Sequence, residues 1–150
     1  MRNATEALES LGDQIGLGKL AFDQEGVCAL IIGEDVEIFL HEDPDDEVLR
    51  LSGVLGDLDE DRPALPLRLL ELNAGDGANG AAAFAVDSET DEILLVRALS
   101  LPEMTPDKLL SAVEEFVSRV QYWIETLPRL ALDDEAEPQD VSQDDMIIRG

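Results

Sequence analysis

The sequence predicts a single α+β domain in which helices pack against a twisted antiparallel sheet, in the order α-β-β-β-α-β-β-α. Apolar residues recur with helical spacing near the start, middle and end of the chain, and strand-like runs fill the segments between. The gaps between neighbouring strand-like runs are short, so these strands must form antiparallel hairpins. We expect the domain to cover residues 1–130, and residues 131–150 to form an acidic, disordered tail.

The first element is a helix predicted over residues 3–15. Asn3, followed three residues later by Glu6, resembles a capping box, which satisfies free backbone N–H groups of the first turn. Gly16 and Gly18 end the helix, because glycine readily adopts the left-handed conformation that follows a helix C-terminus. The apolar residues form one stripe along it: Ala4, Leu8, Leu11 and Ile15.

Three strands are predicted after this helix. Val27–Ile32 is an unbroken apolar run, which is typical of a central strand. Val36–His41 alternates apolar and polar residues with the period of a half-buried strand. The charged turn at 42–47 contains Pro44, which cannot continue a strand, and Val48–Leu55 is the third strand.

A second helix is predicted over residues 63–73, with Pro66 in its first turn because proline lacks the N–H that later positions need. Segments 80–86 and 92–98 read as another hairpin, and residues 87–91 form its turn.

The third helix is predicted over residues 105–127. Thr105 caps its N-terminus, Pro106 occupies the first helical position, and Pro128 ends it. The acidic segment that follows has few core residues, apart from an apolar stretch at 146–149 near its end.

The formal net charge of −25, from 35 acidic and 10 basic residues, narrows the range of partners. Nucleic acid and anionic membranes need Lys and Arg to replace their counterions, so we expect neither to bind. A basic or unfolded protein is the better partner, although the charge could also serve only to keep the protein soluble.

The single cysteine excludes an internal disulfide and fits a reducing compartment. The first residues lack the apolar region of a secretory signal, and no apolar run is long enough to span a membrane. The sequence therefore predicts a cytoplasmic protein.

The letters Gly75-x-Gly77-x-x-Gly80 match a dinucleotide-binding loop, but their context is reversed. Such a loop follows a strand and opens a helix, so that the helix N-terminus meets the pyrophosphate. Here the motif follows a predicted helix and precedes a strand, so Gly75 is interpreted as a helix cap and the rest as a loop. We predict no nucleotide and no other cofactor.

No catalytic or metal site is predicted. Asp57, Asp59 and Asp61 match the first positions of a calcium loop, but arginines stand where the loop needs glycine and glutamate. Cys28 and His41 lie on neighbouring strands, and the hairpin register decides whether they share a face. Nothing in this acidic chain lowers the pKa of the thiol as a nucleophile requires.

Several motifs in a fixed order resemble a known family. The first helix ends in an Ile-Gly-Leu turn, which leads into Leu20-x-Phe22-Asp23-x-x-Gly26 and the strand CALII. The hairpin FAVDSETDEILLVRAL and the closing helix FVSRVQYWIETL follow. Over about residues 3–128 the chain resembles the class I chaperones of bacterial type III secretion, the Tir-chaperone (CesT-like) family.

This resemblance implies a homodimeric chaperone that is not an enzyme and uses no ATP. Such chaperones bind the N-terminal segment of a secreted effector in extended form and keep it stable and export-competent. The resemblance also implies a dimer interface on the second helix and the neighbouring sheet, for which the sequence offers Leu65, Leu69, Leu70, Leu72, Phe84 and Val96.

A groove for the effector segment would come from apolar side chains of the first helix, the following loop and the first strands. The predicted partner-binding residues are Leu8, Leu11, Ile15, Leu20, Phe22, Val36, Ile38, Leu40, Leu49 and Leu51. The alternative interpretation is that these residues simply fill the core. The rival functional class is an acidic regulatory protein, such as a nucleic-acid mimic, that binds a basic protein; an enzyme comes third.

Overall fold

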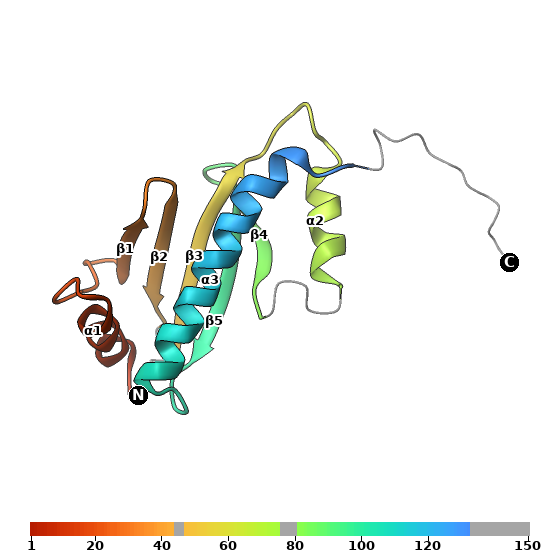
Figure 1. Ribbon diagram of the computed structural model, residues 1–150. Coiled ribbons are helices and arrows are strands. Elements are labelled where there is room, and N and C mark those ends of the chain that lie inside the picture. Colours follow the sequence, from red (N-terminus) through yellow and green to blue (C-terminus); the bar gives the residue numbers. More distant parts are fainter. Residues whose placement is uncertain (44–46, 76–80, 133–150) are drawn as a thin grey trace, which may run out of the picture.

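The computed structural model describes residues 1–43, 47–75 and 81–132. Within these ranges it confirms the predicted α+β class and element order (Figure 1). The elements are α1 (Ala4–Ile15), β1 (Val27–Ile32), β2 (Val36–Glu42), β3 (Val48–Asp57), α2 (Leu65–Asn73), β4 (Ala83–Asp87), β5 (Glu92–Ser100) and α3 (Pro106–Thr126). A short 3-10 turn, Leu127–Arg129, follows α3.

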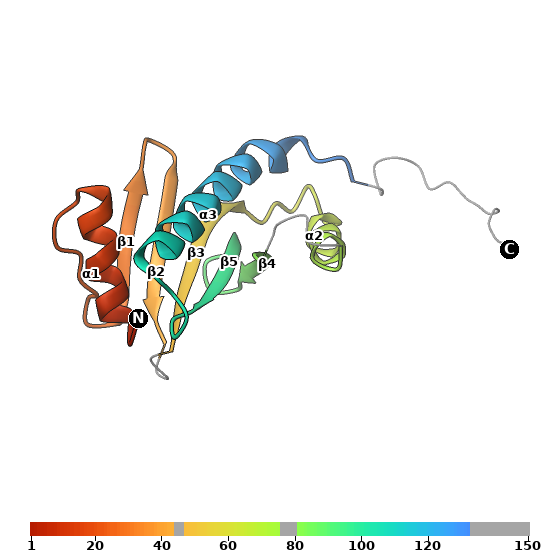
Figure 2. The ribbon, with the colours of Figure 1, turned by 60° about the horizontal axis from the view of Figure 1, so that its bottom comes forward.

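The five strands form one antiparallel sheet in the order β1-β2-β3-β5-β4, so β1 and β4 are its edges. Helices α1 and α3 contact each other and lie on one face of the sheet, whereas α2 lies beside β4 at the end away from α1 (Figures 1 and 2). We call the face that packs against α1 and α3 the helix face, and the opposite one the open face. The sheet is thus covered by helices on one side.

Capping interactions fix the ends of α1 and α3 as predicted. Asn3 Oδ1 accepts a hydrogen bond from the Glu6 backbone N–H at 2.8 Å, and Gly16 ends α1 with a φ of 75°. Thr105 Oγ1 accepts a hydrogen bond from the Lys108 backbone N–H at 3.3 Å. Each N-cap satisfies a donor that has no partner within the helix, which stabilises the helix by about 1 kcal/mol.

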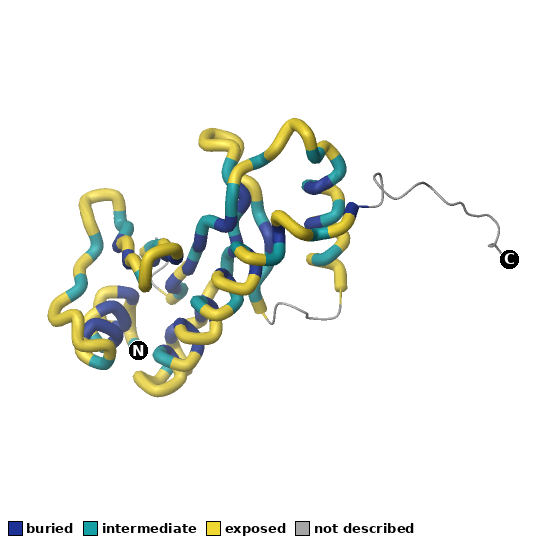
Figure 3. Tube along the Cα trace, turned by 45° about the horizontal axis from the view of Figure 1, so that its top comes forward, coloured by how far each residue is buried: buried dark blue, intermediate teal, exposed yellow. Residues whose placement is uncertain are grey.

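The core lies between the helix face and the buried sides of α1 and α3 (Figure 3). Alternate strand residues point into it, so the period-two interpretation of β2 and β3 is confirmed. The strand residues with no more than 1% of their surface exposed are Val36, Ile38, Leu40, Leu49, Leu51, Ile93 and Leu95. Leu8 and Leu11 of α1 and Phe116 and Val120 of α3 complete this core from the helices.

Strand β3 approaches α3 so closely at Gly53 that a side chain there would collide with the helix. A Cβ atom at Gly53 would lie 2.7 Å from Val120 Cγ2. We expect Gly53→Ala to lower the free energy of unfolding by about 1–3 kcal/mol, the usual cost of overpacking. Gly56→Ala in the same strand is the matched control, because a Cβ there meets no atom within 4 Å. Urea denaturation compares the two, and equal stabilities would show that β3 and α3 separate easily at this point.

Strand β1 is an edge strand, which corrects the prediction that its apolar run marks a central strand. Cys28 and Leu30 are buried on the helix face, whereas Ile31 is 73% exposed. The run is therefore apolar on both faces although only one is covered. An unbroken apolar pattern here marks a second apolar surface and not burial on both sides.

Some element boundaries differ from the predicted ones by a few residues. β3 extends to Asp57 and β5 to Ser100, because their pairing continues on both sides of an irregularity near Gly56. Helix α2 begins at Leu65 and ends with Ala74 as its C-cap, one residue before the predicted cap.

Three parts of the sequence interpretation lie outside the described residues: the turn with Pro44 (44–46), most of the glycine motif (76–80), and the acidic tail with its apolar stretch (133–150). Among the helices of the described ranges, none is both long and apolar enough to cross a membrane.

Candidate partner-binding surface

In the described part of the chain, no helix lies over the open face of the sheet (Figures 1 and 2). Apolar side chains, among them Phe39 and Val96, line this face. The strand register aligns one row of residues across all five strands: Ala29, Phe39, Ser52, Val96 and Ala83. A solvated sheet face is usually polar, whereas this row is almost entirely small or apolar. Such a surface indicates an interaction site.

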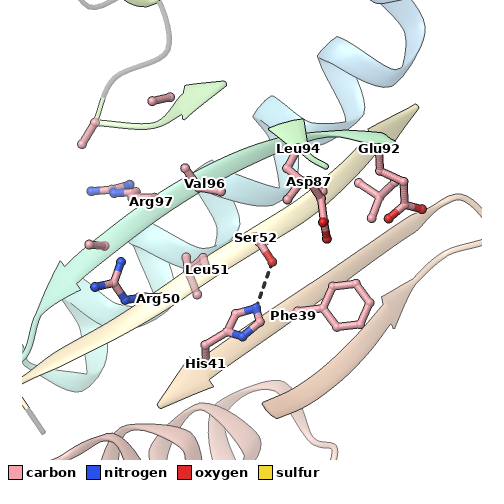
Figure 4. Close-up of a pocket in the computed structure, with 14 residues that line it drawn as sticks. Phe39, His41, Arg50, Leu51, Ser52, Asp87, Glu92, Leu94, Val96 and Arg97 are labelled. Carbon is pink, nitrogen blue, oxygen red and sulfur yellow. Dashed lines mark hydrogen bonds between the residues drawn. The ribbon is translucent and has the colours of Figure 1, made fainter. Parts of the chain in front are cut away.

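The centre of this face is hollowed into a trough of about 710 Å³ (Figure 4). Strands β2, β3, β5 and β4 form its floor, and its larger apolar lining residues are Phe39, Leu51, Val54, Leu94 and Val96, of which Leu51 is almost fully buried. Ala83 and Ala98, whose side chains are short, leave the space open. The volume is in the range of sites that bury a ligand or several side chains of a partner.

His41 provides a polar group in the trough. Its Nε2 atom lies 3.1 Å from Ser52 Oγ, and its ring centroid lies 6.4 Å from that of Phe39 (Figure 4). Partial burial lowers the pKa of His41, and the neighbouring Arg50 guanidinium lowers this pKa further. Arg50 is itself held by Asp43 Oδ2, which accepts a hydrogen bond from Nε at 3.0 Å and forms an ion pair with the terminal nitrogen Nη2 at 2.9 Å. At neutral pH the trough is therefore uncharged at His41.

Cys28 lies on the opposite side of the sheet from His41, which settles the question that the sequence left open. The register pairs Cys28 with Leu40 and His41 with Val27, so the two side chains point to opposite faces. Burial raises the pKa of the Cys28 thiol, and a hydrogen bond from the Ala21 backbone opposes this only in part. His41 cannot serve as a base for this thiol.

Large apolar side chains are exposed at both ends of the sheet. Ile15, Leu17 and Ile31 are exposed on α1, the loop after it and β1, and we call them together the β1-end patch. Leu67, Leu70, Val86 and Tyr122 are exposed on α2, β4 and α3, and we call them together the α2-end patch. The Tyr122 ring packs edge-on against Trp123 at 5.1 Å, and Trp123 packs in the same way against Phe84 of β4 at 4.9 Å. Two separate apolar patches indicate two separate contacts.

The two edges of the sheet differ in how their backbone groups are satisfied. At β4, the side chain of Asn73 in α2 donates a hydrogen bond to Phe84 O at 3.1 Å and accepts one from Phe84 N–H at 2.8 Å. At β1, the backbone N–H of Asp23 donates a hydrogen bond to Val27 O at 2.8 Å, and Asp23 Oδ1 accepts one from Val27 N–H at 3.0 Å. Residues 29–31 of β1 pair on one side only within the described ranges, so this part of β1 is an open edge.

A smaller hollow of about 350 Å³ lies between α1 and the loop that follows it. Leu8, Leu20 and Phe22 line it, together with charged side chains at the rim. The loop is packed tightly onto α1, because a Cβ atom at Gly12 would collide with the carbonyl oxygen of Gly18. This tight packing holds the loop, and with it the hollow, in a fixed position relative to α1.

The sequence matches the model of the Tir chaperone protein (CesT) family over residues 6–124. The chain belongs to the Tir chaperone family. It is also 30% identical to the Tir chaperone of Citrobacter freundii over 114 residues, which are 76% of this chain and 72% of that protein. The resemblance seen in the sequence motifs is thereby confirmed.

Solved structures share this Tir chaperone fold. The chain superimposes on a chain of the HopA1-SchA chaperone-effector complex with a TM-score of 0.63 at 20% identity, covering 80% of this chain and 91% of that one. It matches a chain of the ExoU-SpcU complex from the type III secretion system of Pseudomonas aeruginosa with a TM-score of 0.63 at 16% identity, covering 79% and 95%. At these identities the likeness shows the fold.

In this member of the Tir chaperone family, most predicted partner-binding residues belong to the core of the single subunit, as the alternative interpretation held. The buried ones are Leu8, Leu11, Val36, Ile38, Leu40, Leu49 and Leu51. Leu20 and Phe22 are half-buried beside α1, and Ile15 is 38% exposed. A side chain without exposed surface cannot contact a partner while the subunit keeps its fold, and which residues bind a partner stays a prediction.

The predicted dimer-interface residues are divided in a similar way. Leu65, Leu69 and Phe84 are buried within the subunit, and Leu72 is half-buried. Leu70 is exposed, and Val96 lines the trough. Sequence reasoning missed Leu67, Phe39, Val54 and Leu94, although strands with apolar residues at both odd and even positions were a signal for a second apolar face.

Proposed function

We propose that this protein is a type III secretion chaperone, which binds the N-terminal segment of a secreted effector in extended form and keeps it stable and export-competent. Membership of the Tir chaperone family carries this proposal. Chaperones of structurally similar complexes support it, because one is described with an effector and another with a type III secretion system. The protein acts without catalysis, and it works in the bacterial cytoplasm.

The trough and the open β1 edge offer the two kinds of contact that an extended segment needs. The backbone of the segment pairs with residues 29–31 of β1, and its apolar side chains cover Ile31 and enter the trough. Ordering a flexible segment costs on the order of 2–5 kcal/mol, so the contact must bury a large apolar area to offset this cost. An uncovered sheet face supplies such an area.

We further propose that two copies associate through the α2-end patch. Leu67 and Leu70 are each 63% exposed on α2, and Val86 lies on the neighbouring strand β4. A two-fold axis at this patch brings the same side chains of both copies into contact. The trough and the β1 edge of each subunit then stay available for the effector.

The acidic surface suits this role. A net charge of −25 keeps a molecule with exposed apolar patches soluble, and it attracts basic segments from a distance. The nucleic-acid mimic is not favoured, because such a protein has no use for an apolar trough.

Capture of a secreted protein from the cytosol of secreting bacteria tests the proposal. Val96→Asp places a carboxylate on the floor of the trough, so we expect capture to weaken by about tenfold or more. Ser111→Asp on the exposed side of α3 is the control and should leave capture unchanged. Limited proteolysis of the captured protein should leave its N-terminal segment protected.

Measuring capture at high salt concentration distinguishes a chaperone from an acidic nucleic-acid mimic. Apolar burial is not screened by ions, so we expect capture to persist in high salt. Loss of capture in high salt would favour the mimic, and full capture by a folded Val96→Asp variant would show that the trough is not the site.

A further inference from the structure

The outer edge of β4 is closed at Phe84 by a side chain. Phe84 directs its backbone N–H and C=O away from β5, because both groups bond to Asn73 of α2. In an antiparallel sheet, a neighbouring strand would engage the same two groups through a pair of N–H···O bonds. The carboxamide of Asn73 donates one of these bonds and accepts the other, so it takes the place of that strand.

The position of Asn73 is fixed by the helix that carries it. Leu65 and Leu69 of α2 are each only 2% exposed, so the helix is anchored in the core beside β4. Phe84 is buried as well, and its ring packs against Trp123. Both ends of the Asn73–Phe84 contact therefore rest on packed side chains, which keep the carboxamide at the strand edge.

Without the Asn73 contact, the edge strand β4 would be open to pairing with other chains. Alternation along the strand gives Val86 the same outward backbone direction as Phe84, and the Val86 side chain is 44% exposed. An unprotected edge with exposed apolar side chains is a template for pairing with another chain. At β1 the equivalent polar contact, from Asp23, lies at the first residue of the strand and leaves residues 29–31 open.

We propose that Asn73 determines where this protein accepts a strand: its carboxamide closes β4, so that an extended chain adds only at β1. The inference deepens the proposed function and rests on it for the identity of that chain as an effector segment. Each subunit then holds a single strand-accepting edge, and the β4 end stays free for contact between helices. Asn73 is a positioning residue, since it acts by occupying backbone groups.

The test compares Asn73→Ala with Glu71→Ala in the full chain. Asn73→Ala removes both hydrogen bonds to Phe84, whereas Glu71→Ala removes only an exposed ion pair with Arg68 on the same helix. We expect the Phe84 amide of Asn73→Ala to exchange its hydrogen about tenfold faster or more. Sedimentation over a concentration series should show assemblies larger than those of the wild type, formed by pairing of β4 edges, while Glu71→Ala behaves as the wild type.

Asn73→Asp is the second variant, in case the alanine variant unfolds. It keeps an acceptor for Phe84 N–H but sets a carboxylate oxygen against Phe84 O, so larger assemblies are expected here too. A purely structural role would lower the free energy of unfolding and leave the assembly size of the folded variants unchanged, and that result would overturn the proposal. Because these measurements use the chain alone, they stand apart from effector capture by the wild type, on which the proposed function depends.

Discussion

Replacing Ile38 with aspartate is expected to unfold the protein. Ile38 lies on β2 with no exposed surface, between α3 and the centre of the sheet. A carboxylate there has no partner, so it must either stay charged in an apolar core or take up a proton. We expect the free energy of unfolding to fall by more than about 4 kcal/mol, which is a large share of the stability of a domain this size. Circular dichroism with urea denaturation measures the change.

Phe39→Asp is the matched control, because the next residue along β2 points to the open face and lines the trough. This variant should keep its fold and lose effector capture, whereas Ile38→Asp should lose both. If Ile38→Asp folds normally and fails only in capture, then the helix face is reachable by a partner, and the assignment of the contact to the open face is contradicted.

The double variant Leu67→Asp, Leu70→Asp is expected to separate the two copies of the chain. Both leucines are exposed on α2, and in a two-fold contact each would be buried against the partner copy. Two charged residues in such an apolar contact should weaken association by about a hundredfold or more. Analytical ultracentrifugation of the wild type and the variant gives the dissociation constants.

Leu17→Asp makes a close control for this variant. Leu17 is 58% exposed, much like Leu67 and Leu70, but it belongs to the β1-end patch at the other end of the sheet. We expect Leu17→Asp to leave the assembly intact. A wild type that stays monomeric at all concentrations, or dissociation caused by Leu17→Asp alone, would refute the assignment of the α2-end patch to self-association.

Local sequence signals predicted the elements well because each depends on residues close together in the chain. The caps at Asn3 and Thr105 bond to backbone groups three residues away, and the hairpin between β1 and β2 needs only a short turn. The same signals left open which face of a strand is covered. The more apolar face of β2 and β3 packs against the helices, since burying it removes more apolar surface from water. The sequence interpretation had offered those residues to a partner.

The trough could not be predicted, because it depends on pairing between distant parts of the chain. Phe39, Ser52 and Val96 come together only when β3 pairs with both β2 and β5 in one register. The contact between Asn73 and Phe84 likewise depends on where α2 comes to lie after folding. Phe84 is the first residue of the hairpin motif that resembles the family, but the spacing of that motif does not mark a contact with Asn73.

Because helices cover only one side of the sheet, the stability of this protein depends on whether an effector is bound to the other side. Any chain that occupies the open face binds the folded state and not the unfolded one, so its binding free energy adds directly to the resistance of the chaperone to unfolding. The effector then stabilises the chaperone, just as the chaperone stabilises the effector. Copies made in excess of the effector would lack this stabilisation and would unfold more readily.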